Sequence, residues 1–327
     1  MTVSRVLHDS PRVAPLTRQR VQAALRALKY RPDPHIARLM SLVRGRKPSR
    51  IRAVLAVVRE QALKDELLEP AYQYVSIKDI RRRAEQHGYH AEEFWLGRGG
   101  MDPGRLAHIL QARGIEGIIV SPQSSRMLCS QLDFTPFAAA TFGYGLSQPS
   151  LHRAAGNMSL GIHMAVTALA AAGYRRIGLA ITRWVDARAE RGYSGAMLHF
   201  QQDVARRDRV PMLLFPHNDL SRCAGVFRDW MKAHRPDALI TFDTYVPDWL
   251  GQMGLRVPED IGLVVHDWTD KMKGYAGIHQ RREHVASAAV DLVATQLLQH
   301  ERGVPEVPRQ ILIPPAWVPG SSIRLPG

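Results

Sequence analysis

Short apolar runs alternate with longer amphipathic segments from about residue 51 to the end of this 327-residue chain. The first of these runs, Arg52–Val58 (RAVLAVV), is almost continuously apolar, as is typical of a parallel strand that is buried on both faces. The segment Ala71–Gly88 that follows has the spacing of an amphipathic helix. Strands and helices that alternate in this way predict βαβ units, and hence an α/β fold class with parallel sheets.

The alternation restarts once, near residue 157, and so predicts two parallel-sheet, Rossmann-like lobes with a ligand cleft at the carboxyl ends of their strands. We expect the first lobe at about 51–150 plus 281–309 and the second at about 151–280 plus 310–327. The further strands are expected at 89–96, 117–120, 136–142, 176–181, 212–215, 238–241, 261–265 and 310–313, and the further helices at 103–113, 157–172, 186–205, 221–234, 246–253 and 282–301.

Positive charge is concentrated at the start of the chain. Residues 1–52 contain thirteen Arg or Lys against two acids, Asp9 and Asp33, and so carry +11, whereas the whole chain carries +14. The other 275 residues therefore carry only +3. This distribution favours a polyanion-binding module joined to a nearly neutral domain, because neutralised phosphates supply most of the non-specific affinity for nucleic acid. A solvated basic face on a helical appendage is the alternative.

Several other kinds of site are not indicated by the sequence. Cys129 and Cys223 lie far apart without metal-ligand spacing, and the fourteen histidines are scattered, so neither a disulfide framework nor a metal site is expected. Because no nucleophile or phosphate-loop motif is complete, we expect neither an enzyme nor a cofactor. No apolar run reaches the roughly 18 residues of a membrane span, and the polar start is not a signal peptide, which favours the cytoplasm.

Short motifs along most of the chain occur in a characteristic order. They are TVSRVL from Thr2, SPRV from Ser10, TRQRV from Thr17, LKYRP from Leu28, AAAGYRRIGLA from Ala170, RPDALIT from Arg235 and GLRVPEDIGLVVHD from Gly254. In order and spacing they resemble the lactose/galactose repressor (LacI/GalR) family of bacterial transcription regulators. The resemblance implies a helix-turn-helix headpiece and hinge helix at 1–50, and an effector-binding and dimerisation core at 51–327 shaped like a periplasmic binding protein. It also implies a homodimer on a palindromic operator in double-stranded DNA.

The resemblance places the start of the chain inside the recognition helix, so we expect the true start to lie upstream; the alternative is that this chain binds DNA poorly. Thr2, Ser4 and Arg5 would lie on that helix, and Arg5 has the reach to bond guanine in a bidentate manner. A phosphate contact is the alternative for Arg5. Thr17 is expected to cap the following helix. The other headpiece residues that we expect to contact DNA are Arg12, Arg18 and Tyr30.

Residues 35–43 resemble the family's hinge helix, which we expect to become ordered on DNA because so short a helix is marginal alone. Arg38 lies in this segment, and either Leu39 or Met40, depending on the alignment, matches the apolar side chain that the family inserts into the minor groove. Pairing of two hinges in a dimer is the other interpretation of these apolar residues, and it does not exclude the first.

The resemblance is weaker in the expected effector site. Asp267 and Gln280 match a cleft aspartate and glutamine of the family, whereas Arg191 is only adjacent to the expected arginine position, which is Gly192 here. The usual Asn-Asp pair is Phe242 followed by Asp243. Trp268, like Trp184 and Phe242, could offer a stacking surface or simply pack in the core. His266 is either a pH-sensitive cleft residue or a buried histidine with its hydrogen bonds satisfied.

We therefore predict a sequence-specific DNA-binding regulator, a repressor by the resemblance, whose operator affinity is modulated by a small molecule, by default a sugar. A solute-binding protein without a DNA-binding role is the main alternative, and a regulator that has lost its effector response is another. An enzyme ranks third among the classes, because no catalytic constellation is present.

Overall fold

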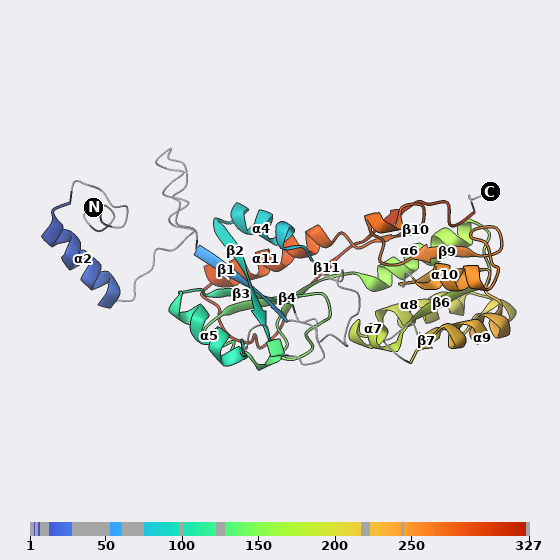
Figure 1. Cartoon of the computed structure of the whole chain (residues 1–327), viewed down its shortest axis with the longest axis horizontal. Coiled ribbons are helices and arrows are strands. Elements are labelled where there is room, and N and C mark those ends of the chain that lie inside the picture. Colours follow the sequence, from blue (N-terminus) through green and yellow to red (C-terminus); the bar gives the residue numbers. More distant parts are fainter. Residues whose placement is uncertain are drawn as a thin grey trace. The chain divides into compact units, whose positions relative to one another are not determined.

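The computed structural model of the chain describes residues 3, 6, 13–27, 53–60, 75–97, 101–121, 128–216, 223–242 and 245–324. The chain divides into two compact units. The first comprises Met1–Ala53 with His87–Tyr89, and the second comprises the rest. Figure 1 shows the chain coloured from its N-terminus to its C-terminus.

The described part of the first unit is built around helix α2, Pro15–Ala27. Proline suits the first position of a helix because its fixed φ is already helical and its missing N–H would have no partner there. Thr17 therefore lies inside the first turn rather than at the cap, so the helix begins three residues earlier than predicted. Val6 and Val13 are buried in this unit, whereas Val3 is 48% exposed. The predicted hinge helix at 35–43 lies outside the described residues.

The first sheet of the core has the strand order β11-β5-β4-β3-β1-β2. The strands paired with β3, β4 and β5 all run parallel. Helix α5, Pro103–Ala112, packs its Leu106 and Leu110 against Ile118 and Val120 of one face. Helix α4, Ile77–Gln86, lies with α11 on the other side of the sheet (Figure 1). The strands are β1 (Ala53–Glu60), β2 (Tyr89–Leu96), β3 (Gly117–Ser121), β4 (Ala138–Phe142), β5 (His152–Gly156) and β11 (Gln310–Ile313).

The second sheet has the order β12-β10-β9-β8-β6-β7, with β12 antiparallel to β10. Alternate residues of β6 face opposite layers: Leu179 packs with α6 and α8, whereas Ala180 packs with α9 and α10. The strands are β6 (Ile177–Thr182), β7 (Leu213–Phe215), β8 (Ala238–Thr241), β9 (Gly262–Val265), β10 (Ala276–His279) and β12 (Ala316–Val318), and the helices are α6 (Met158–Ala171), α7 (Arg183–Arg188), α8 (Gly192–Gln202), α9 (Ala224–His234) and α10 (Tyr245–Gln252).

The chain passes between the sheets three times, from β5 into α6, from β10 into helix α11 (Arg282–Leu298), and from β11 into β12. Helix α11 belongs to the first lobe because the side-chain amide of Gln296 donates to the carbonyl of Ala139 on β4 (3.1 Å) and accepts from its N–H (3.2 Å). Since β5 and β11 lie in the first sheet, two crossings come a few residues later than the expected boundaries at about 150 and 309.

The architecture confirms the predicted α/β class with two parallel-sheet lobes. Three short strands, β5, β10 and β12, were not predicted, and the helix predicted at 186–205 is two helices. The break occurs because Glu190 (φ 53°) and Arg191 (φ 60°) adopt the left-handed conformation. The buried Asp186 carboxylate then accepts the N–H of Ser194 at 3.0 Å and caps the new helix.

Candidate functional site

Polar side chains gather where the strands of the second sheet end. His266 and Asp267 directly follow β9, and Gln280 follows β10, which pairs with β9 in parallel. Because the carboxyl ends of parallel strands lie at one edge of a sheet, these side chains come from neighbouring positions. This is the edge at which open α/β sheets bind ligands.

His266 forms the buried centre of this group. Its ring stacks on Phe242 with centroids 5.0 Å apart and meets the edge of Tyr193 at 5.1 Å. Helix α6 passes so close that a Cβ on Gly161 would lie 2.5 Å from His266 Nε2, so only glycine fits there without displacement. Burial lowers the pKa of His266 to about 3, because the charged ring would lose its hydration.

Gln280 fixes the orientation of this histidine. Its Nε2 donates to the carbonyl of His266 at 2.7 Å and lies 3.2 Å from His266 Nδ1. An amide nitrogen can only donate, so Nδ1 accepts and the neutral ring carries its proton on Nε2. The other end of the amide, Gln280 Oε1, is buried and has no hydrogen-bond partner in the described part of the chain.

Asp267 is paired on one side only. Its Oδ2 accepts from Nη2 of Arg282, and the two side chains are 7% and 22% exposed. Its Oδ1 is buried and unpartnered among the described residues. A buried acceptor without a donor costs about 1–3 kcal/mol. Two such acceptors, on Asp267 and Gln280, are the arrangement that a ligand with hydroxyl or amine donors would complete.

The two lobes also touch at a second place near this edge. Arg188 on α7 donates from Nε to the carbonyl of Tyr144, which follows β4, at 3.3 Å, and its guanidinium lies 4.1 Å from the ring centre of Trp184. Arg153 of β5 donates to the carbonyls of Gly143 (2.8 Å) and Leu146 (2.6 Å). Burial lowers the pKa of Arg153 and raises the pKa of Tyr144. The carboxyl ends of strands from both sheets therefore meet here.

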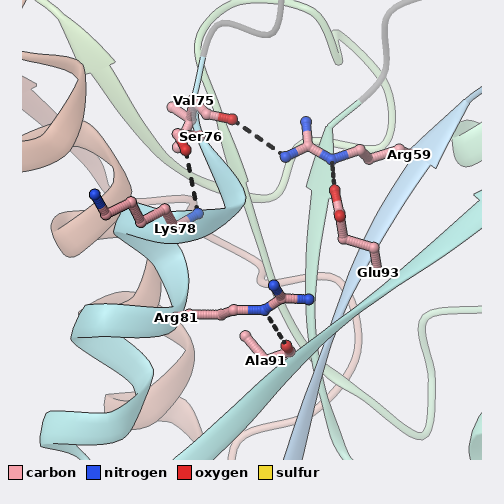
Figure 2. A network of polar contacts seen from close by, with 7 residues as sticks. All are labelled: Arg59, Val75, Ser76, Lys78, Arg81, Ala91 and Glu93. Carbon is pink, nitrogen blue, oxygen red and sulfur yellow. Dashed lines mark hydrogen bonds and ion pairs between the residues drawn. The ribbon is translucent and has the colours of Figure 1, made fainter.

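The first lobe has its own buried polar network at the end of β1 (Figure 2). The fully buried Arg59 donates from Nε to Glu93 on β2 at 2.5 Å and from Nη2 to the carbonyl of Val75 before α4 at 3.2 Å. Its Nη1 is buried without a partner in the described chain. Next to it, Glu60 accepts the N–H of Cys129 at 2.5 Å, and burial raises the pKa of the Cys129 thiol.

The structure brings some of the sequence-predicted effector residues together. Asp267 and Gln280 meet around His266. Trp268 lies beside them, but its indole N–H donates to the carbonyl of Tyr275 at 3.0 Å and so ties down the loop before β10. The side chain of Arg191 is exposed on the turn that opens α8. Asp243 lies outside the described residues.

Two residues of this group were not predicted. Tyr193 lies next to the arginine position that the sequence singled out, and Arg282 lies two residues after Gln280. The roles of both residues depend on contacts with residues of other elements, so the spacing of residues in the sequence did not indicate either of them. A separate hollow of about 410 Å³ on α9 and α10, lined by Arg228, Lys232 and Trp249 among others, contains none of the predicted site residues.

Of the DNA-binding residues predicted from the sequence, the structure describes Arg18. It lies half-buried in the first turns of α2, and its N–H donates to the carbonyl of Ala14 at 3.0 Å. The other eight predicted contacts lie outside the described residues: Thr2, Ser4, Arg5, Arg12, Tyr30, Arg38, Leu39 and Met40.

In the described ranges, no helix is long and apolar enough to span a membrane. The same ranges hold no group of three or more His, Cys, Asp or Glu side chains that could bind a metal ion.

Comparisons with known proteins agree with this architecture. Residues 1–33 match the model for bacterial regulatory proteins of the lacI family, and residues 166–323 match the model for the periplasmic binding protein-like domain. A search of the curated proteins found no significant match.

Solved structures with the same fold match between 83% and 99% of the chain. One is the lac repressor dimer bound to operator and the anti-inducer ONPF, with 20% identity, a TM-score of 0.60, and 99% of this chain and 95% of that chain covered. Another is the transcriptional regulator CelR in complex with cellobiose, with 17% identity, a TM-score of 0.59, and 98% and 94% covered. A third is a LacI transcriptional regulator from Rhodococcus species, with 20% identity, a TM-score of 0.60, and 83% and 98% covered.

Fold and site together define a two-lobed, periplasmic-binding-protein-like core that follows a small basic headpiece. The chain thus combines a segment that matches the lacI family of bacterial regulatory proteins with a core that matches the periplasmic binding protein-like domain.

Proposed function

We propose that the chain is a sequence-specific, DNA-binding transcription regulator, acting as a repressor, whose operator affinity changes when a small molecule binds between the lobes. The observation that carries the effector part of the proposal is the pair of buried, unpartnered acceptors, Asp267 Oδ1 and Gln280 Oε1, at the carboxyl ends of β9 and β10. Buried acceptors of this kind are normally satisfied in native structures, so a ligand that donates hydrogen bonds would stabilise this edge.

The DNA-binding part rests on the lacI-family match over residues 1–33 and on the net charge of +11 over residues 1–52. Thr2, Ser4 and Arg5 would face the major groove, where a guanidinium can read guanine through two hydrogen bonds. Arg12, Arg18 and Tyr30 would hold the headpiece on the backbone. Arg38 and an apolar wedge, Leu39 or Met40, would enter the minor groove and bend the operator.

A sugar is the default ligand because vicinal hydroxyls offer the donors that the two acceptors lack. The similar regulator CelR is solved in complex with the sugar cellobiose, although its identity to this chain is only 17%. Arg191, Asp243 and Trp268 are the further side chains proposed to line the site. Phe242 and Tyr193 would supply apolar surface, since both pack on His266.

The proposed mechanism is a shift between two lobe arrangements in a homodimer on a palindromic operator. An effector changes operator affinity only by its different affinity for the two arrangements. The three crossings between the sheets are the segments that would bend. Contacts made across the lobes, such as Arg188 with the Tyr144 carbonyl, would differ between the arrangements.

The experiment is selection from a pool of palindromic duplexes with random centres, at moderate and at high salt, followed by sequencing. We expect one palindrome to be enriched at both salt concentrations. Arg5→Ala should relax selection at a defined base pair, whereas the matched control Arg20→Ala on α2 should only reduce affinity evenly across sequences. Recovery of DNA without any preferred sequence would favour the solute-binding alternative.

A further inference from the structure

The ion pair between Asp267 and Arg282 joins the two lobes. Asp267 follows β9 of the second sheet, whereas Arg282 is the first residue of α11, which packs along β4 of the first. The same helix is fixed farther along by the bidentate pair of Asp291 with Arg83 of α4, at 2.7 and 2.9 Å. Any change in the angle between the lobes must therefore act on the Arg282 contact.

This ion pair also occupies the carboxylate that the proposed effector would use. The guanidinium lies on Oδ2, while Oδ1 is buried and has no partner in the described chain. Each carboxylate oxygen can accept two hydrogen bonds, and the Arg282 guanidinium fills one of these positions on Oδ2 together with the space beside it. A ligand whose two hydroxyls bind both oxygens from that side therefore competes with Arg282 for the same position. Gln280 Oε1, the other free acceptor, lies on the same edge, two residues before Arg282.

We infer that Arg282 is an internal competitor of the effector: it holds the Asp267 carboxylate in the ligand-free core, and a hydroxyl-bearing effector binds Asp267 only by displacing it. This inference rests on the proposed function. Arg282 is thus a positioning residue, which sets the lobe arrangement through Asp267. When the effector displaces Arg282, Asp267 loses its contact with the other lobe and gains a contact with the ligand. The lobe arrangement then changes, and this change couples the cleft to the DNA-binding segment.

The inference can be tested before any natural effector is known. Arg282→Ala leaves a buried carboxylate without its cation, which is strongly unfavourable, and the free guanidinium ion can replace the lost group. In this variant, we expect millimolar guanidinium chloride to raise the midpoint of thermal unfolding in a saturable way. Equal concentrations of urea or sodium chloride should not do so. The matched control is Arg256→Ala, which removes an exposed ion pair with Asp260 (3.0 Å) elsewhere in the second lobe.

Operator affinity separates a regulatory role from a merely structural one. We expect Arg282→Ala to change the affinity for the selected palindrome by about tenfold, within the usual range of allosteric coupling, and guanidinium to reverse the change at constant ionic strength. Arg282→Lys should restore part of the wild-type affinity. Arg256→Ala should leave operator affinity and its response to guanidinium as in the wild type.

Three outcomes would overturn the inference. One is an unfolding midpoint of Arg282→Ala equal to that of Arg256→Ala, and another is the same response to guanidinium in both variants. The third is that guanidinium stabilises Arg282→Ala against thermal unfolding, while the operator affinity of this variant equals that of the wild type. If no operator is found at all, the proposed function fails. The thermal unfolding measurements then still show whether the ion pair between Asp267 and Arg282 stabilises the contact between the lobes.

Discussion

The side-chain nitrogen of Gln280 lies 2.7 Å from the carbonyl oxygen of His266, and it also approaches Nδ1 of the same residue at 3.2 Å. One amide thus clamps the end of β9 to the end of β10 and sets the histidine tautomer. It also leaves Oε1 as a buried acceptor. The clamp holds Asp267, the next residue, at the edge of the sheet.

Loss of this clamp should destabilise the core. Gln280→Leu leaves the His266 carbonyl and Nδ1 without their donor, and we expect the free energy of unfolding to fall by about 1–3 kcal/mol. Urea denaturation followed by circular dichroism measures the change. The control Gln299→Leu, at the exposed end of α11, should change stability by no more than about 0.5 kcal/mol. Equal effects of the two substitutions would mean that the clamp contributes little.

Gly161 should tolerate no side chain. In Gly161→Ala the new Cβ would meet His266 Nε2 at 2.5 Å, so we expect a loss of about 1–3 kcal/mol from overpacking despite the better helix propensity of alanine. Gly251→Ala in α10 is the matched control, because nothing lies within 4 Å of its Cβ. There we expect a gain of about 0.5–1 kcal/mol. If Gly161→Ala is also stabilising, the histidine is not packed as described.

The buried histidine should make the core acid-sensitive. Its folded-state pKa, about 3, lies below its unfolded value of 6.5, so the unfolded chain binds the extra proton first. The free energy of unfolding therefore falls as the pH drops below about 6.5. The contribution of His266 to this fall ends only when the pH reaches its pKa in the folded state.

Between about pH 7 and pH 5 this histidine should account for a loss of about 2 kcal/mol. Urea denaturation of the wild type and of His266→Asn at both pH values gives the comparison. We expect the wild type to lose about 2 kcal/mol more than the variant. The same pH dependence in both proteins would show that His266 is already solvated in the native state.

The sequence predicted most of this fold because largely apolar strands such as β1 (AVLAVVRE) and β6 (IGLAIT) carry a strong local pattern. Three strands beside the crossings were missed for a physical reason. β5 (HRAAG), β10 (AGIH) and β12 (AWV) are short, and β5 and β10 contain alanine and glycine, so only their pairing defines them. The break at Glu190 and Arg191 was missed because neither residue type normally adopts the left-handed conformation.

The site was predictable only where the family resemblance supplied the positions. It selected Asp267 and Gln280, which the structure places on neighbouring strands. Arg282 escaped because an arginine that opens a helix is normally exposed. Its partner is fifteen residues earlier in the sequence and on another strand.

The hinge wedge can be assigned by substitution. Of Leu39 and Met40, the one that enters the minor groove should, when changed to alanine, lower operator affinity by about tenfold or more and reduce DNA bending. Band-shift assays with circularly permuted operator fragments measure both quantities. The other residue should affect affinity less and leave the bend unchanged. If neither substitution alters the bend, the segment does not act as a wedge.

Sequence reading by the chain is the central claim, and a titration tests it most directly. The affinity for the selected palindrome is compared with that for the same base composition in scrambled order, at two salt concentrations. We predict that the palindrome binds at least about a thousandfold more tightly, and that this ratio persists as salt weakens both complexes. Equal affinity for the two duplexes, with the same salt dependence, would contradict the account.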